Sequence, residues 1–177
     1  MMEAYVNWVR ANPLLSAAIQ FGILGTLGEA LSHTVRHKRF ALPCGHYWQI
    51  PLKILAWALL GIIIKYGFVG MKGFTSTLIE HELLPQFMAT GIGWAFAVSV
   101  LTNVFFGPQM MFFHRIEDNL IMGEWNFKGM STALWTLLWF WIPAHTVTFS
   151  LPGEWQVGLA AVWSIALGLI LGMAKGN

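Results

Sequence analysis

Six polar side chains interrupt otherwise apolar segments of the sequence and are its main candidates for chemistry: Glu29, His33, Lys65, Lys72, Asn103 and His145. A charged side chain at the centre of a lipid bilayer costs about 2.5–3.5 kcal/mol on insertion scales, so such groups usually face protein or water. Polar groups that converge from several helices would line a hydrated path and set its charge preference. We predict that these six side chains point into a helical bundle.

The spacing of these groups predicts which of them share a helical face. Glu29 and His33 are four residues apart, which predicts a contact between the carboxylate and the imidazole. Lys65 and Lys72 are seven residues apart and lie on nearly the same face. Two alternatives stay open. Lys72 and Glu29 are close enough to a membrane edge to extend into it, and an amide or imidazole could bond only to a neighbouring backbone.

Two charged clusters at the ends of apolar segments are the candidates for metal binding: Glu80-His81-Glu82 and His114-Arg115-Ile116-Glu117-Asp118. We place the second cluster in the loop after the third helix. Neither cluster has enough ligands for a known metal site. The chain also lacks a glycine-rich phosphate loop, paired cysteines and a haem-attachment motif. We therefore predict no enzymatic activity, no cofactor and no metal.

The composition indicates an integral membrane protein. Hydrophobic residues make up 56% of the 177 residues and charged residues only 10%, whereas soluble proteins carry roughly 25% charged residues. The net charge of +2 is too small to favour nucleic acid as a partner, and a single cysteine, Cys44, excludes an internal disulfide framework. The lipid bilayer is the partner that this composition predicts.

Five segments approach the roughly 20 apolar residues that a membrane helix needs, and they cover about 13–33, 51–74, 86–106, 130–150 and 156–173. No repeat or linker separates them. The fold class that we predict is all-α: a single compact bundle of about five transmembrane helices that forms one domain over residues 1–177. Pro143 should kink the fourth helix, because it cannot donate a hydrogen bond to the carbonyl of Trp139.

The basic residues predict an orientation. Successive ends of the five segments lie on alternate sides of the membrane. Arg10 is then the only basic residue at the ends on one side. The other side has seven basic residues: Arg36, Lys38, Arg39, Lys53, Arg115, Lys128 and Lys175. This bias predicts an N-terminus outside and a C-terminus on the cytoplasmic or matrix side. The membrane would be a bacterial inner membrane or an organelle membrane.

Small residues recur every four positions on the last helix: Ala160, Ser164, Gly168 and Gly172. Small side chains let helices approach closely in lipid. Packing within the bundle is the simpler interpretation of this pattern, and a homo-oligomer that associates through the same residues is the alternative.

Four stretches occur along the chain in a definite order: NPLLSAAIQFGILGTLGEALSH, GFVGMKGFTSTLIEHELLP, TNVFFGP and WFWIPAHTVTFSLP. In this order they resemble the helices of the peroxisomal membrane protein and mitochondrial inner-membrane protein family (the Mpv/PMP type). The residues that correspond to its motifs are Gly28 with Glu29, Pro108, Trp139, Pro143, Pro152 and Trp163. Several positions differ; His33, for example, stands where glutamine is usual.

The resemblance implies a compact bundle of four or five helices in an inner or organelle membrane, and a channel for small solutes has been proposed for members of the family. Our first hypothesis is accordingly a channel or pore-like protein for small solutes or ions, lined by the six polar side chains. The second is a non-transporting scaffold or partner-binding membrane protein. A metal protein or membrane enzyme at His81 or His114 ranks third.

Overall fold

The computed structural model describes residues 2–174, so Lys175 lies outside the described residues. Helices form nearly all of this range, and no strand occurs within it. The predicted all-helical class is therefore confirmed. Three helical stretches are long and apolar enough to cross a membrane: Pro13–His37, Gln49–Glu80 and the continuous stretch Gly91–Met122.

The helices follow one another in this order: α1 (Met2–Ala11), α2 (Pro13–His37), α3 (Gln49–Glu80), the short 3-10 turn η1 (Gln86–Met88), α4 (Gly91–Leu101), η2 (Thr102–Phe106), α5 (Gly107–Met122), α6 (Met130–Thr136), η3 (Leu137–Trp141), α7 (Ile142–Phe149) and α8 (Gly153–Ala174). Both η2 and η3 are π-helical. Because α4, η2 and α5 continue without a break, as do α6, η3 and α7, the described chain forms five long rods preceded by α1.

The third rod is the main correction to the sequence-based boundaries. We expected it to end near Phe106, with His114 and Asp118 in a loop, but both residues lie in α5. The first residue that stops the helix is Gly123, whose φ of 69° lies in the left-handed region and whose amide closes on the carbonyl of Asn119. Helix α3 also extends beyond its predicted range, to Glu80.

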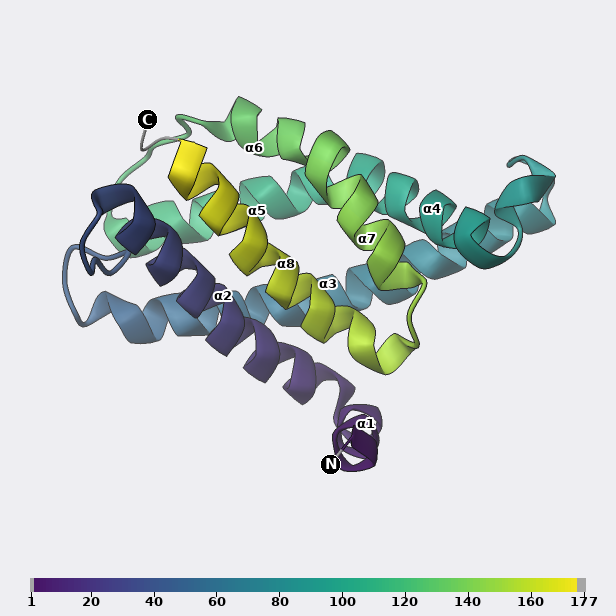
Figure 1. Cartoon of the computed structure of the whole chain (residues 1–177), viewed down its shortest axis with the longest axis horizontal. Coiled ribbons are helices and arrows are strands. Elements are labelled where there is room, and N and C mark those ends of the chain that lie inside the picture. Colours follow the sequence, from purple (N-terminus) through teal and green to yellow (C-terminus); the bar gives the residue numbers. More distant parts are fainter. Residues whose placement is uncertain (1, 175–177) are drawn as a thin grey trace.

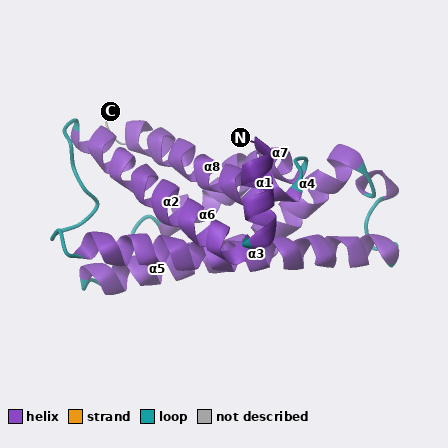
Figure 2. Cartoon of the chain, turned by 90° about the horizontal axis from the view of Figure 1, so that it is seen from below, coloured by secondary structure: helices purple, strands orange, loops and turns teal. Residues whose placement is uncertain are grey.

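The rods cross in two layers. Figure 1 shows α2 and α8 running side by side as diagonals, with α3 crossing behind them. Seen from below, in Figure 2, α3 and α5 run along one side of the molecule, and α2 and α8 lie over them. Helix α2 packs against both α3 and α8, and α4 packs against α7. Every rod therefore has a face that borders the middle of the bundle.

Helix α2 has large side chains on its outer face and small ones on its inner face. Its exposed residues recur every four positions: Leu15, Ile19, Ile23, Leu27 and Leu31. On the inner face, Ala17 is fully buried, and a Cβ added to Gly28 would lie 3.0 Å from Ile165 of α8. Close contact through small residues is how helices associate in lipid, so this pattern is compatible with a membrane protein.

The start of the predicted small-residue ridge on α8 faces inward. Ala160 is 2% exposed, and Ser164 donates a hydrogen bond to the carbonyl of Ala160. The surroundings of Gly168 and Gly172 lie outside the described part of the structure. The two ridge residues whose surroundings are described therefore pack within the bundle, and the homo-oligomer stays a prediction.

Candidate functional site

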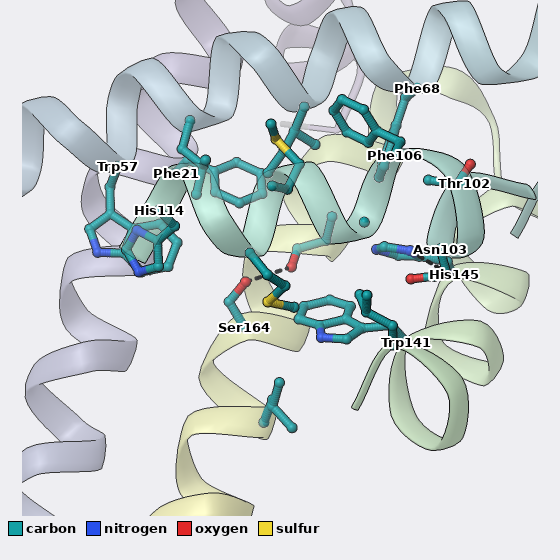
Figure 3. Close-up of a pocket in the computed structure, with 18 residues that line it drawn as sticks. Phe21, Trp57, Phe68, Thr102, Asn103, Phe106, His114, Trp141, His145 and Ser164 are labelled. Carbon is teal, nitrogen blue, oxygen red and sulfur yellow. Dashed lines mark hydrogen bonds between the residues drawn. The ribbon is translucent and has the colours of Figure 1, made fainter. Parts of the chain in front are cut away.

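A cavity of about 210 Å³ lies in the middle of the bundle, and all five rods contribute to its wall. Figure 3 shows side chains from these rods converging on one space. The lining is largely apolar, with aromatic rings, two methionines and a small set of polar groups: Phe21, Trp57, Phe68, Thr102, Asn103, Phe106, Met110, Met111, His114, Trp141, His145 and Ser164 are among the lining residues. An apolar pocket with a few convergent polar groups is the usual form of a small-molecule site.

One face of α3 connects the cavity with both ends of the bundle. Lys53, Trp57, Ile64, Phe68 and Lys72 are spaced by four or seven residues, which keeps them on the same side of the helix. Ile64 and Phe68 line the cavity, and Trp57 lines its end nearest Lys53. The face of α3 that lines the cavity therefore carries a lysine on either side of it, Lys53 toward one end of the bundle and Lys72 toward the other.

The two π-helical segments flank the cavity. In each of them the backbone makes a hydrogen bond across five residues, from the amide of Gly107 to the carbonyl of Thr102 and from the amide of Ile142 to the carbonyl of Leu137. A proline stands two residues after the end of each segment, at Pro108 and Pro143, and has no amide hydrogen to donate to the helix. The helix continues past each proline through a wider, π-helical turn. The distortion that we predicted at Pro143 is therefore a π-helical turn. Single π-helical turns occur frequently at functional sites.

Asn103 and His145 meet at the side of the cavity. The Nδ2 atom of Asn103 lies 3.3 Å from Nδ1 of His145 and donates a second hydrogen bond, of 2.8 Å, to the carbonyl of Ser99. The hydroxyl of Ser99 in turn donates to the carbonyl of Ile142, at 2.7 Å. These bonds join α4 and η2 to the fourth rod, and Figure 3 shows Asn103 and His145 pointing into the cavity.

Several polar atoms around the cavity have no partner among the described residues. Thr102 Oγ1, Trp141 Nε1 and His114 Nδ1 are all buried and make no hydrogen bond. An unsatisfied buried donor or acceptor costs about 1–3 kcal/mol, and few native groups are left in this state. These three atoms belong to residues of the cavity wall, but the surrounding protein encloses each of them, so the polar surface that faces the cavity is small.

A cluster of three charged side chains lies beyond one end of the cavity. Lys53 Nζ is 2.5 Å from Glu29 Oε1 and 2.9 Å from Asp118 Oδ1, and the Lys53 side chain is only 4% exposed. Trp57 Nε1 donates to the second oxygen of Glu29 at 3.1 Å. The Trp57 ring lies against Gly25, where any side chain would overlap it, and its centroid is 4.4 Å from that of His114. This ion cluster of Glu29, Lys53 and Asp118 joins α2, α3 and α5.

Polar contacts also occur at the opposite end. Lys72 Nζ donates to Gln156 Oε1 at 3.0 Å, and Arg10 pairs with Glu154 at 2.6 Å. The hydrogen bond from Arg10 lowers the pKa of the Glu154 carboxyl. Lys65 is partly buried on α3. Neither Lys65 nor Lys72 occurs among the residues that line the cavity.

The six predicted polar residues therefore do not form one convergent set. Glu29 belongs to the ion cluster, Asn103 and His145 line the cavity, and Lys72 lies at the far end. The predicted contact between Glu29 and His33 is not formed. Glu29 reaches Lys53 on the neighbouring helix, and His33 stacks on His37 with ring centroids 5.5 Å apart.

Sequence reasoning missed Lys53, Trp57 and Asp118 as members of a site. Lys53 counted only as a basic residue at a membrane edge, and Asp118 was placed in a loop. The sequence could have indicated that Lys53 and Trp57 lie next to each other, because they are four residues apart on one helix. Nothing in the sequence indicated that α5 brings Asp118 to them.

The motif residues at the other positions have structural roles. Pro108 and Pro143 are the second residues of α5 and α7, and the carbonyl of Pro152 accepts the Trp155 amide at the start of α8. Trp163 Nε1 donates to Thr148 Oγ1 at 3.2 Å and so joins α8 to α7, whereas Trp139 is 45% exposed.

The structure provides no set of ligands for a metal ion among the described residues. His114 Nδ1 and Glu117 Oε2 are 4.0 Å apart on α5, and within residues 2–174 no group of three or more metal-ligating side chains is assembled. Comparisons of the chain with models of protein families, with curated proteins and with solved structures found no match, so the family resemblance of the sequence remains a prediction.

Proposed function

We propose that this protein is a channel-like membrane protein through which small solutes pass, and that the central cavity is the compartment they occupy. One observation carries the proposal: a cavity of about 210 Å³ inside a bundle whose outer face is apolar. Simple close packing of five rods would leave few voids larger than a water molecule. A space of this size, lined by Asn103, His145 and Ser164, is better explained as a place for a solute.

The dimensions of α3 support this proposal. Lys53 and Lys72 are nineteen residues apart on one helix, which corresponds to ~28 Å at 1.5 Å per residue. The hydrocarbon core of a bilayer is about 30 Å thick. In a membrane-spanning bundle the two charged ends would thus lie near the two surfaces, and the cavity would lie between them. With the orientation that the basic residues favour, the ion cluster would be on the cytoplasmic or matrix side.

The solutes that suit this cavity are small and uncharged. No charged side chain is among the described residues that line it, and aromatic and aliphatic groups form most of the wall. An ion would lose its hydration here without a compensating charge. Trp57 and His114 line the end of the cavity nearest the ion cluster, with their ring centroids 4.4 Å apart.

The test is solute permeation into proteoliposomes, measured by osmotic swelling with small uncharged solutes. Ser164→Phe should reduce swelling to the rate of empty liposomes, because the new ring would occupy the cavity that Ser164 lines. Val162→Phe is the matched control, since Val162 is 45% exposed on the same helix; it should swell as the unmodified protein does.

Unmodified protein that gives no swelling above empty liposomes at any pH or redox condition would contradict the proposal. So would equal permeation through the Ser164 and Val162 variants. Recordings in planar bilayers extend the test to ions, for which we expect no conductance.

A second function, a non-transporting scaffold, is favoured by the ion cluster. Glu29 and Asp118 both pair with Lys53, so these charges join three helices and need no solute to satisfy them. Under this alternative the cavity would be a packing defect. A protein that is as stable or more stable when the cavity is filled, with no change in permeation, would favour the scaffold.

A further inference from the structure

We propose that the cavity binds one small, uncharged aromatic molecule that carries a hydroxyl group, a phenol being the simplest example. This inference rests on the proposed function, because it names the class of solute that the same compartment accepts. Three properties of the cavity lead to it: its size, the chemistry of its wall, and an amide oxygen that accepts no hydrogen bond from the described residues.

The volume fits a single substituted ring. A cavity of about 150 Å³ lined by aliphatic and aromatic side chains is enough to hold benzene, whereas pockets for drug-sized ligands measure about 300–1,000 Å³. At about 210 Å³ the cavity lies between these sizes. It therefore has room for one ring with one or two substituents and excludes a long acyl chain or a nucleotide.

The wall favours an aromatic ring over an aliphatic solute of the same size. Phe21, Phe68, Phe106 and Trp141 surround the space. Aromatic pairs in edge-to-face or offset geometry contribute about 0.5–1.5 kcal/mol beyond the area they bury. Met110 and Met111 complete the wall, and flexible thioether side chains adapt to different ring substituents.

The polar side of the cavity favours a hydroxyl group. Asn103 is 2% exposed and points into the space, as Figure 3 shows. Its Nδ2 atom bonds to Ser99 and His145, but within the described chain no donor reaches its amide oxygen. A phenolic O–H would donate to this oxygen.

A charged ring compound is disfavoured. The carboxylate of a benzoate would enter a space where no described lysine or arginine lines the wall, and an unpaired buried charge costs far more than a hydroxyl that finds a partner. The three properties together select a neutral, hydroxylated ring.

The experiment is equilibrium binding of three fluorinated probes to the full-length protein in lipid nanodiscs, followed by ¹⁹F NMR. The probes are 4-fluorophenol, fluorobenzene and 4-fluorobenzoate, and empty nanodiscs measure partition into lipid. We expect saturable binding of 4-fluorophenol that unlabelled phenol displaces. Fluorobenzene should bind at least about fivefold more weakly, which is the loss expected for one hydrogen bond, and 4-fluorobenzoate should not bind.

Asn103→Leu should remove the preference for 4-fluorophenol over fluorobenzene while leaving fluorobenzene binding in place. If this variant does not fold, the comparison of the three probes on the unmodified protein still decides the proposal. Ser164→Phe should abolish binding of all probes, and Val162→Phe should preserve it. Signals identical to those of empty nanodiscs, or equal affinity for 4-fluorophenol and fluorobenzene, would overturn the inference.

The outcome separates this inference from the proposed function. Solute permeation without selective binding of 4-fluorophenol would overturn only the ligand class. Selective binding without permeation of any solute would instead make the cavity a ligand site of a protein that does not transport, and would overturn the proposed function.

Discussion

Lys53→Met is expected to destabilise the folded protein by about 3 kcal/mol, because it leaves two partly buried carboxylates without their shared, buried cation. Lys53 is 4% exposed, and its ammonium group contacts both Glu29 and Asp118. The two acids, with side chains 16% and 23% exposed, would then repel each other in a site that is only partly solvated. Methionine keeps most of the length of the lysine side chain, so the loss of stability would measure the effect of removing the charge.

The measurement is the free energy of unfolding by detergent titration, compared with three other variants. Lys65→Met on the same helix is the matched control and should have a small effect, because Lys65 takes no part in the ion cluster. The triple variant Lys53→Met, Glu29→Gln, Asp118→Asn should recover most of the loss, since no uncompensated charge remains. Glu154→Gln should have little effect, because its pairing with Arg10 is exposed. A Lys53→Met protein as stable as Lys65→Met would show that the ion cluster does not hold the helices together.

Gly61→Ala should destabilise the protein by about 1–3 kcal/mol through overpacking. An added Cβ at this position would lie 2.6 Å from the carbonyl oxygen of Ala17 and 2.7 Å from Cβ of Phe21. The first of these atoms belongs to the backbone of α2, so the methyl group cannot be accommodated by a rotating side chain. The two helices would have to separate, and Phe21 would lose its place in the wall of the cavity.

Gly70→Ala on the same helix is the control, because a Cβ there meets nothing within 4 Å. Alanine is favoured over glycine in helices by about 0.8–1 kcal/mol, so this variant should be as stable as the parent or more so. Opposite signs for the two substitutions are the expected result of an unfolding titration. Equal effects would mean that α2 and α3 do not make the close contact described here.

The helices were predictable from the sequence, whereas their exact ends were not. Apolar runs of sufficient length identified the core of each rod, and Pro13 marks the start of α2 as expected. The polar stretch around His114 was read as a loop because it is charged, yet nothing in it prevents a helix before Gly123. Asn12 stands just before α2, but its side chain does not cap that helix and donates backward to the carbonyl of Trp8 in α1. Charge alone is therefore a weak signal for a helix end.

The candidate site was predictable only in part, because a sequence gives the face of each helix but not which faces meet. Asn103 and His145 were expected to turn inward, and the structure brings them within 3.3 Å of each other. The partner of Glu29 was sought four residues away on its own helix, whereas the structure supplies Lys53 from α3. Pro108 and Pro143 indicated that these two helices would be distorted. They did not indicate a π-helical turn, because the extra residue in each turn depends on tertiary packing.

The most direct test of the central claim, that the bundle encloses a solute compartment, is diffraction from crystals of the protein grown in lipid with 4-bromophenol. The anomalous signal of bromine locates the probe without any assumption about function. We predict a bromine peak inside the bundle, within contact distance of Asn103, Trp141 and Ser164. Bromine found only on the lipid-facing surface, with the interior closed by side chains, would contradict the account.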